Sequence, residues 1–390
     1  MSHSKTKRLY FFDNLRAFII LLMVVFHIAM GYTTWDLKWW YVNDTEHSAF
    51  FDLFVFSTDV YIMPVMFLIA GYFAPMVLQR KGQAAFWRGK LLRIALPWVL
   101  GVIFCAPIIA YAAFLTRPIA APPYLEFWTT GFFGPFYQQA QYWFLGMLFG
   151  FFAVFSLAAR LFPRILEKAP VKKAPSPLFL LAFFAFTALT FFVGDLYYWC
   201  DTWMPGLKGI FFLQPVRLGI HISYFCLGIY AWKYAWFSRG GWQPRLVPWC
   251  SATVVSMAVF LIYRVMFTLM PEPPVLFRAG HAFTHSLLVL TAVFALLAIF
   301  QRFIDSDAWL WRRLSANSYT IYFIHFFIII PIGALLQQHT LPIALKYLLA
   351  SSLSLVLCFL AAEYLIQPLL SLVLHRKKAR RLNQLSENHH

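Results

Sequence analysis

Charged residues are scarce in this chain of 390 residues, which has only 15 acidic side chains and 12% charged residues in all. Soluble globular proteins carry about 25% charged residues and are about half apolar. Here 61% of the residues are hydrophobic and 44 are Phe, with a mean hydropathy of +0.68. These figures exclude a soluble enzyme, a disordered chain and a collagen-like fibre. They predict an integral membrane protein.

Several common motifs are also missing. The chain has no Walker A sequence, no dinucleotide-binding glycine pattern and no GxSxG, which removes support for ATP-driven transport and serine-hydrolase chemistry. The five cysteines are scattered without a CxxC pair, so neither a zinc site nor a disulfide framework is expected. The net charge of +17 does not indicate nucleic-acid binding, because the basic residues lie in short clusters between apolar runs.

The apolar runs predict the fold class, an all-α polytopic membrane protein. A spanning helix needs about 20 residues, and ten stretches of this length are expected to span: 15–34, 56–78, 92–115, 141–162, 177–199, 209–236, 247–270, 281–302, 315–337 and 343–374. We expect a single transmembrane domain over residues 1–375. A basic tail follows over 376–390, and its last two histidines resemble the remnant of an affinity tag.

Lys and Arg are distributed unevenly between the predicted loops. Clusters lie in alternate loops and in the tail, whereas each remaining loop carries only one, namely Lys38, Arg117, Lys208, Arg278 and Lys346. Basic residues are retained on the cytoplasmic side of a membrane. Both termini are therefore expected in the cytoplasm, where the basic segments could also contact anionic lipid headgroups.

The first predicted helix carries ionisable residues on one face. Arg16 and His27 are eleven positions apart, which is three helical turns and about 16 Å along the axis. Together with Asp13 they form a line from the cytoplasmic mouth to a histidine expected near the middle of the membrane. Ionisable residues at such depth commonly face a cavity or a partner. The alternative is a histidine that merely hydrogen-bonds a neighbouring group.

A second polar line runs along the ninth predicted helix. Ser315, Ser318, Tyr322 and His325 follow three- and four-residue spacing and share a face. Small polar residues in such positions also join neighbouring helices, so only the histidine strongly suggests a functional site.

Two pairs at i, i+4 spacing lie in later spans. Arg217 shares a face with His221, and His281 shares one with His285. A histidine pair can bind a metal ion, but no HExxH glutamate and no nearby cysteine accompany His281, so no metal is expected. Further intramembrane candidates, each able to form a buried salt bridge, are Asp59, Arg264 and Glu363.

The two polar lines fit more than one function. An arginine could hold the phosphate of a cytoplasmic donor while a histidine deprotonates an acceptor hydroxyl. A proton-coupled secondary transporter would use similar residues, although no inverted repeat supports it. A third interpretation is a non-catalytic partner that anchors a glycan-assembly complex.

Four segments in order along the chain narrow these alternatives: Asp13 to Arg16 followed by His27, FLIAGYF at 67–73, KLLRIALP at 90–97 and NSYTIYFIHF at 317–326. WFL at 143–145 and YFCLGIYA at 224–231 accompany them. Together they resemble the motifs of acyltransferase family 3, whose members are ten-helix membrane enzymes. Ala70 stands where the family usually has Ser, and Lys90 where it has Arg. The first two helices look most similar to a subgroup associated with succinylation of periplasmic glucans.

The resemblance implies acyl transfer from cytoplasmic acyl-CoA to a hydroxyl of a periplasmic glycan. Arg16 and His27 would be the essential pair, while His325 and Tyr322 would line the opposite wall and stabilise the oxyanion. The CoA phosphates are expected among Arg16, Arg88, Lys90 and Arg93, although Lys90 lacks the bidentate fork of an arginine. The remaining expected substrate contacts are Asp13, Trp143, Arg217, His221 and Ser318.

The resemblance leaves the acyl group open between acetyl and succinyl. A succinyl group would need an extra cation near the site, which Arg217 or Arg264 could supply. The expected location is the bacterial inner membrane. The expected partners are the glycan acceptor and membrane lipids, with no nucleic acid, and either a second copy of the chain or other glycan-biosynthesis proteins.

Overall fold

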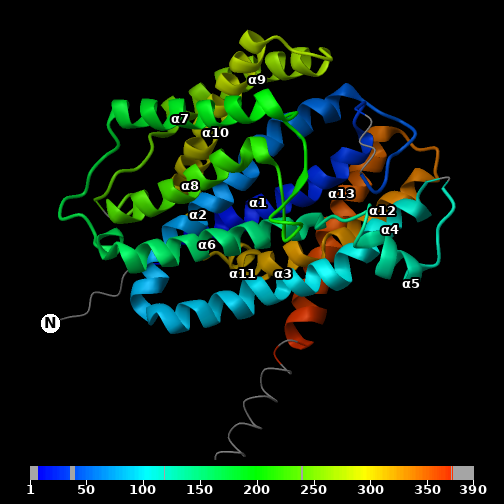
Figure 1. Ribbon diagram of the computed structural model, residues 1–390, viewed down its shortest axis with the longest axis horizontal. Helices are drawn as coiled ribbons and strands as arrows, with labels where there is room; N and C mark the ends of the chain where they lie inside the picture. Colours follow the sequence, from blue (N-terminus) through cyan, green and yellow to red (C-terminus); the bar gives the residue numbers. More distant parts are fainter. Residues whose placement is uncertain (1–7, 36–39, 118, 239, 370, 372–390) are drawn as a thin grey trace, which may run out of the picture.

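A computed structural model describes residues 8–35, 40–117, 119–238, 240–369 and 371. Most of these residues form helices that run roughly along the long axis of the molecule (Figure 1). The basic tail predicted over 376–390 lies outside the described residues. The longer helices are α1 (Tyr10–Ala29), α2 (Ala49–Lys90), α6 (Trp143–Leu161), α7 (Pro177–Tyr197), α8 (Pro215–Lys233), α9 (Leu246–Thr268), α10 (Val275–Phe303), α11 (Trp309–Ile324), α12 (Phe326–Gln337) and α13 (Ile343–Leu360).

Helices α1 and α10 form the interior of the bundle. Most side chains of α1 are buried, and α1 packs against α2, α10, α11 and α13. Most of α10 is buried as well. By contrast α9 leaves Val254, Val255 and Ile262 exposed on the outside. An apolar exterior around a packed interior is expected of helices that face lipid.

Helices α2 and α8 approach each other closely enough to exclude side chains. A Cβ atom at Gly71 would lie 2.0 Å from the carbonyl oxygen of Phe225, and one at Gly228 would lie 2.2 Å from that of Leu68. Small residues allow such contacts between membrane helices. The glycine of the FLIAGYF segment is therefore required by packing.

The chain reverses direction within α2 at Gly82, whose φ of 74° favours glycine. After this turn the helix continues through two π-helical turns, η2 (Leu91–Ala95) and η3 (Gly101–Cys105), with α3 (Leu96–Leu100) between them, into α4 (Ala106–Leu115). The predicted spans 56–78 and 92–115 consequently lie on opposite sides of Gly82.

The predicted span 315–337 is broken. Helices α11 and α12 meet at His325 and are bent by 65°. The last predicted span, 343–374, corresponds within the described residues to α13, the π-helical segment η7 (Ala361–Ile366) and the helical residues up to 369.

The all-α expectation needs one correction, because a small β-hairpin lies between α7 and α8. Strand β1 (Met204–Gly206) pairs antiparallel with β2 (Phe211–Leu213). Residues 207–209 have positive φ angles, as tight hairpin turns require. The hairpin packs on α3, since Phe211 stacks on Trp98 with ring centroids 5.4 Å apart. The other short elements are η1 (Met30–Tyr32), α5 (Tyr124–Glu126), η4 (Phe127–Phe132), η5 (Ala140–Tyr142) and η6 (Pro163–Leu166).

The protein is a multi-pass membrane protein. Within the described residues, seven helical stretches are long and apolar enough to cross a membrane, and α11 with α12 makes an eighth if counted as one span. The count is below ten partly because 49–115 passes as one stretch despite the turn at Gly82, and because α8 is not among them. Ten spans therefore remain a prediction.

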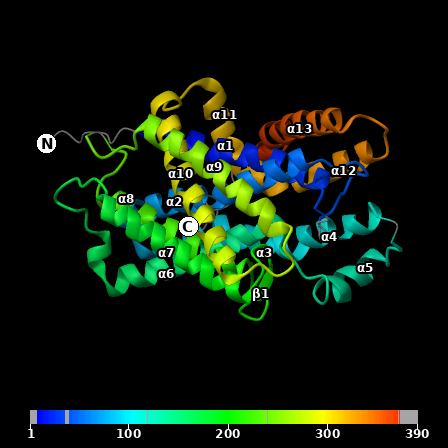
Figure 2. The same ribbon diagram turned by 90° about the horizontal axis from the view of Figure 1, so that it is seen from above.

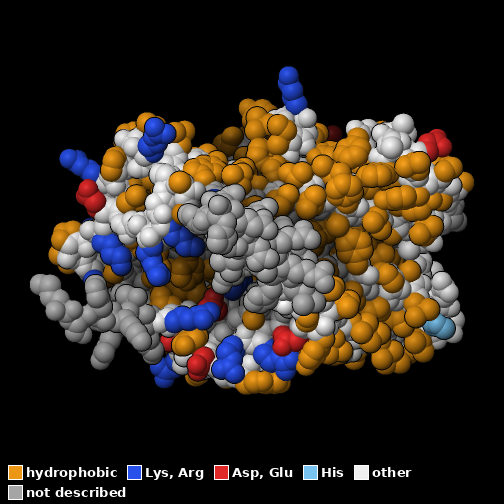
Figure 3. Space-filling model, turned by 90° about the horizontal axis from the view of Figure 1, so that it is seen from below, with side chains coloured by type: hydrophobic (Ala, Val, Ile, Leu, Met, Phe, Trp, Pro, Cys, Tyr) orange, Lys and Arg blue, Asp and Glu red, His pale blue; other side chains and the backbone are white. Residues whose placement is uncertain are grey.

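The two ends of the long axis differ in charge. Helix α5, in a predicted outer loop, lies at one end, and the segment between α6 and α7, in a predicted inner loop, lies at the other (Figures 1 and 2). On the face shown in Figure 3, Lys and Arg gather on the half nearer the α6–α7 segment, while the other half of this face is mainly hydrophobic. Basic residues are retained on the cytoplasmic side of a membrane, and the orientation with the inner loops in the cytoplasm remains a prediction.

Candidate active site

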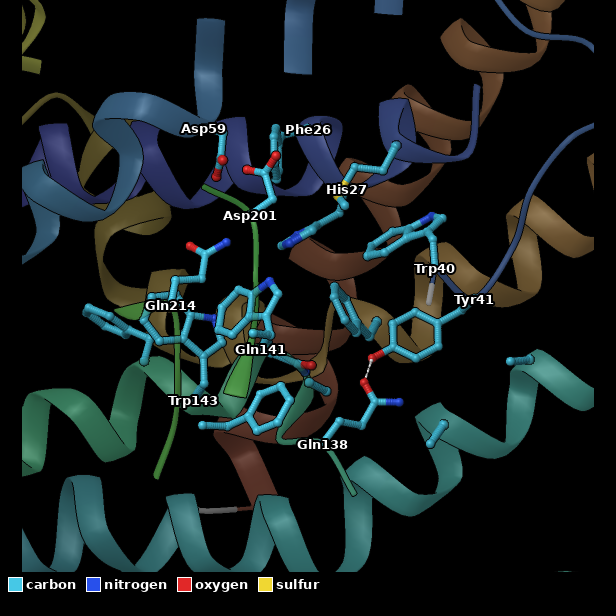
Figure 4. Close-up of a pocket in the computed structure, with 18 of the residues that line it drawn as sticks. Phe26, His27, Trp40, Tyr41, Asp59, Gln138, Gln141, Trp143, Asp201 and Gln214 are labelled. Atoms are coloured by element: carbon cyan, nitrogen blue, oxygen red, sulfur yellow. Dashed lines mark hydrogen bonds between the residues drawn. The ribbon is translucent and has the colours of Figure 1, made fainter. Parts of the chain in front are cut away.

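A cavity of about 680 Å³ lies among the far ends of α1 and α4, the start of α6 and the hairpin. Its lining is largely aromatic, with a few polar groups that converge on the space, an arrangement typical of small-molecule sites. Figure 4 shows the imidazole of His27 pointing into it, with Asp59 and Asp201 together on one wall and Trp40 and Tyr41 on the other side.

His27 is positioned by the end of α1. It lies in the last turn of the helix, at the end away from Arg16. Trp40 stacks almost parallel to its ring, with centroids 5.5 Å apart and an angle of 11°. Phe326 meets the ring edge-on at 4.8 Å. These contacts hold the imidazole in one orientation at the cavity wall.

His27 and His325 form a hydrogen-bonded pair. Nε2 of His325 lies 3.1 Å from Nδ1 of His27, and Nδ1 of His325 lies 2.7 Å from the carbonyl oxygen of Tyr322. A carbonyl only accepts, so Nδ1 of His325 carries the proton. In the neutral pair, Nε2 of His325 then accepts from Nδ1–H of His27. His27 therefore keeps its lone pair on Nε2, and this nitrogen can accept a proton as a general base.

The break between α11 and α12 is held by side chains of the segment that leads into α6. The carbonyl oxygen of Phe323 accepts hydrogen bonds from the Gln141 amide at 3.1 Å and the Tyr142 hydroxyl at 3.0 Å. The Tyr322 hydroxyl donates to the carbonyl oxygen of Gln141. Tyr322 lines the cavity, but its proton is engaged there, so its geometry suits positioning His325 better than binding an oxyanion.

Aromatic rings and amides line much of the rest of the cavity. The hydroxyl of Tyr41 donates to Oε1 of Gln138 at 2.6 Å, and burial raises the pKa of this phenol, so it stays a neutral donor. Trp143 packs edge-on against Trp203 at 5.0 Å. His221 lies between Trp143 and Phe67 and also lines the cavity.

A row of alternating positive and negative side chains forms the cavity wall beside Asp59. Arg217 forms ion pairs with Asp59 and, at 3.0 Å, with Asp201, and Arg264 pairs with the other oxygen of Asp201. Burial opposes ionisation of Asp201, but Arg264 and Arg217 outweigh it and hold the pKa of this carboxyl below its ordinary value. Both arginines are therefore matched by carboxylates, and an incoming anion would have to compete with Asp59 or Asp201.

The predicted site residues fall into two groups. The structure brings together His27, His325, Tyr322, Trp143, Arg217 and His221 in or against the cavity. It does not bring the others there. Arg16 pairs with Asp13 at 3.3 Å near the opposite end of α1.

The predicted CoA-binding residues also lie away from the cavity lining. Arg88 and Arg93 are exposed, and Nζ of Lys90 lies 3.3 Å from the ring centroid of Phe152. The backbone carbonyl of Arg93 accepts a hydrogen bond from Tyr319 on α11 at 2.9 Å. Ser318 hydrogen-bonds back to its own helix at the carbonyl of Ser315.

Sequence reasoning missed most of the polar lining. The missed side chains include Trp40, Tyr41, Arg117, Tyr137, Gln138, Gln141, Asp201, Thr202, Trp203 and Gln214. Gln141 is the first residue of the predicted span 141–162 and Gln214 lies near the start of 209–236. The others lie in predicted loops. The signal was present as runs of aromatic and amide residues in the outer loops, WWYVND at 39–44 and YQQAQYW at 137–143.

Comparisons with known proteins give one family match. The sequence profile of a family described as an acyltransferase domain matches residues 9–363. Glucans biosynthesis protein C of Shigella dysenteriae serotype 1 is 32% identical over 102 residues, which are 26% of this chain and 26% of that protein. The proteins of the same name from Salmonella paratyphi B and Salmonella heidelberg match to the same extent. The alignment spans about a quarter of these relatives' length. No solved structure matches the chain.

Proposed function

The chain belongs to the acyltransferase domain family and is an acyltransferase, and from this premise we propose its reaction. It transfers an acetyl or succinyl group from cytoplasmic acyl-CoA to a hydroxyl of a cell-envelope glycan in the bacterial inner membrane. The observation that carries the proposal is the His27–His325 pair at the wall of a large cavity lined by aromatic and amide side chains.

The cavity suits a carbohydrate acceptor. Tryptophan faces such as those of Trp40 and Trp143 pack against the apolar faces of sugar rings, while amides and carboxylates hydrogen-bond their hydroxyls. The polar groups here, including Gln138, Gln214 and Asp59, surround the same space as His27. The name of the glucans biosynthesis relatives supports a glycan as the acceptor.

His27 acts as the general base. Its Nε2 lone pair takes the proton of the acceptor hydroxyl as the oxygen attacks the thioester carbonyl carbon. The C–S bond then breaks, and the proton held by His27 passes to the leaving sulfur, giving an ester and a free thiol. His325 orients the ring and stabilises the imidazolium formed in the middle of the reaction.

The donor approaches from the basic end of the bundle. Arg16 remains partly exposed, with 38% of its side chain accessible, and Arg88 and Arg93 are exposed on η2 and the preceding turn. Guanidinium groups bind phosphates well. Arg16 and His27 are about 16 Å apart along α1, a path that the extended pantetheine arm would follow. The cavity already reaches back along α1 to Met23.

The choice of acyl group bears on Arg217 and Arg264. Both line or adjoin the acceptor cavity, but each already pairs with a carboxylate. A succinyl carboxylate would gain from them only by displacing Asp59 or Asp201. Acetyl transfer needs no such exchange.

Mass spectrometry of envelope glycans tests the function. Cells lacking the endogenous enzyme would express the wild type, His27→Ala or, as a matched control, His339→Ala, which alters an exposed histidine after α12. We expect an acyl mass increment with the wild type and the control but not with His27→Ala at equal membrane abundance. The increment identifies the acyl group.

Two outcomes contradict the proposal. If His27→Ala retains the increment, His27 is not the base. If the wild type adds no acyl group but takes up a sugar or acyl metabolite under a proton gradient, the protein is a transporter in which the histidines relay protons.

A further inference from the structure

Three side chains of different chemistry converge behind the acceptor cavity. Asp195 at the end of α7, Cys200 in the next loop and His281 near the start of α10 each offer one ligand atom, and these atoms lie within 4.8 Å of one another. All three residues are buried, with Asp195 0%, Cys200 2% and His281 1% exposed. Carboxylate, thiolate and imidazole are the ligand types that zinc takes in proteins.

Two members of this cluster, His281 and Asp195, lack the hydrogen bonds that burial demands. Neither ring nitrogen of His281 and neither carboxylate oxygen of Asp195 has a hydrogen bond among the described residues. Burying such groups without a partner is costly. A small cavity of about 30 Å³ lies beside two of the ligands. Cys200 and His281 line it together with His285, Arg217 and Arg264, whereas Asp195 is not part of its lining. This volume has room for an ion or a water molecule.

Two arginines support the anionic members of the cluster from outside. Nη1 of Arg264 donates to Sγ of Cys200 at 2.7 Å, and Nη1 of Arg278 lies 3.5 Å from Oδ2 of Asp195. In this structure the Cys200 thiol itself donates to Oδ2 of Asp201 at 3.5 Å. Once a metal ion displaces that proton, the guanidinium donor stabilises the thiolate. Donors of this kind commonly orient metal ligands and tune their charge.

The charges also balance around a divalent ion. A thiolate and a carboxylate neutralise two positive charges, and the neutral imidazole of His281 adds none. The charge of Arg264 is separately matched by Asp201. A zinc ion therefore gives the unpartnered atoms a partner, and the charge of Arg278 is left on a side chain that is 20% exposed.

We propose that Asp195, Cys200 and His281 bind a zinc ion whose fourth ligand is water. A tetrahedral ion with bonds of about 2.0–2.3 Å needs ligand atoms about 3.5 Å apart, so the ligand atoms, now within 4.8 Å of one another, would have to move closer to bind it. The ion ties α7 and α10 to the loop that carries Asp201 and Trp203 to the acceptor cavity. The proposal does not depend on the acyl-transfer mechanism.

Cobalt(II) substitution of the purified full-length protein tests the site. The protein in detergent would be stripped of metal with a chelator and titrated with cobalt(II), which absorbs through thiolate-to-metal charge transfer when a cysteine binds it. Metal analysis of the protein as isolated would give the zinc content. The variants are Cys200→Ser and His281→Ala, and the matched control is Cys358→Ser, which alters another buried cysteine on α13.

We expect one cobalt ion per chain, with the charge-transfer band present in the wild type and Cys358→Ser. The band should be absent in Cys200→Ser, and His281→Ala should bind cobalt at least tenfold more weakly. A folded wild type that shows no band overturns the proposal, and this result needs no variant to fold. A band that persists in Cys200→Ser also overturns it, because the thiolate would then come from elsewhere.

Discussion

Replacing His325 by Leu tests the role of the histidine pair most directly. The substitution places an apolar side chain at the α11–α12 break. It removes the Nε2 acceptor that lies 3.1 Å from Nδ1 of His27. A buried donor left without a partner costs about 1–3 kcal/mol. His27 can reduce this cost by donating more fully to the backbone of Met23, by turning, or by moving its proton to Nε2. The last two changes remove the base from the acceptor hydroxyl.

If that cost falls on the transition state, kcat should decrease about 5- to 150-fold. KM for the acceptor should change little, because His325 does not line the cavity. The assay is the initial rate of glycan acylation by purified protein, normalised to the monodisperse fraction in size-exclusion chromatography.

His325→Gln is the matched control, since its amide oxygen can accept from Nδ1–H of His27. We expect it to retain more activity than His325→Leu. A wild-type kcat in His325→Leu would refute the proposed role of His325 in orienting His27. So would equal losses in the Leu and Gln variants, because the acceptor atom would then be irrelevant.

Three further predictions concern packing, charge and the acceptor. Gly71→Ala should destabilise the protein by about 1–3 kcal/mol, because its Cβ would lie 2.0 Å from the backbone oxygen of Phe225; a thermal midpoint equal to that of the wild type would contradict the close α2–α8 packing. Asp201→Asn should lower the free energy of unfolding by about 3–5 kcal/mol, since it leaves two buried guanidinium groups short of a partner. In urea unfolding this loss should be larger than that of Asp59→Asn, because the Asp59 side chain is 35% exposed. Tyr41→Phe should raise KM for the acceptor severalfold with kcat nearly unchanged, and a fall in kcat alone would place Tyr41 in the chemical step.

The helical framework could be predicted from the sequence because a helix needs about 20 mainly apolar residues to cross a lipid bilayer. Each predicted span overlaps a helix of the structure, including 92–115 and 209–236. What the apolar pattern could not show was where helices turn or break, because these depend on single residues. Gly82 reverses the chain, and His325 marks the bend between α11 and α12.

The site was only partly predictable for a different reason. His27 and His325 stand out because histidine is costly in a membrane, and the structure places them in contact. The rest of the cavity depends on loops that meet only after folding. The metal ligands show this most clearly: the sequence offered no cysteine near His281, yet Cys200 reaches it across 81 positions of the chain.

The two histidines are separated by 298 positions along the chain, and this distance has a consequence for biogenesis. A ribosome must deliver all but the last helices to the membrane before the second histidine exists. Until then α1 holds an imidazole without its acceptor, at the edge of an unfinished cavity. A chain cut short during synthesis therefore carries His27 without the acceptor that fixes its proton on Nδ1.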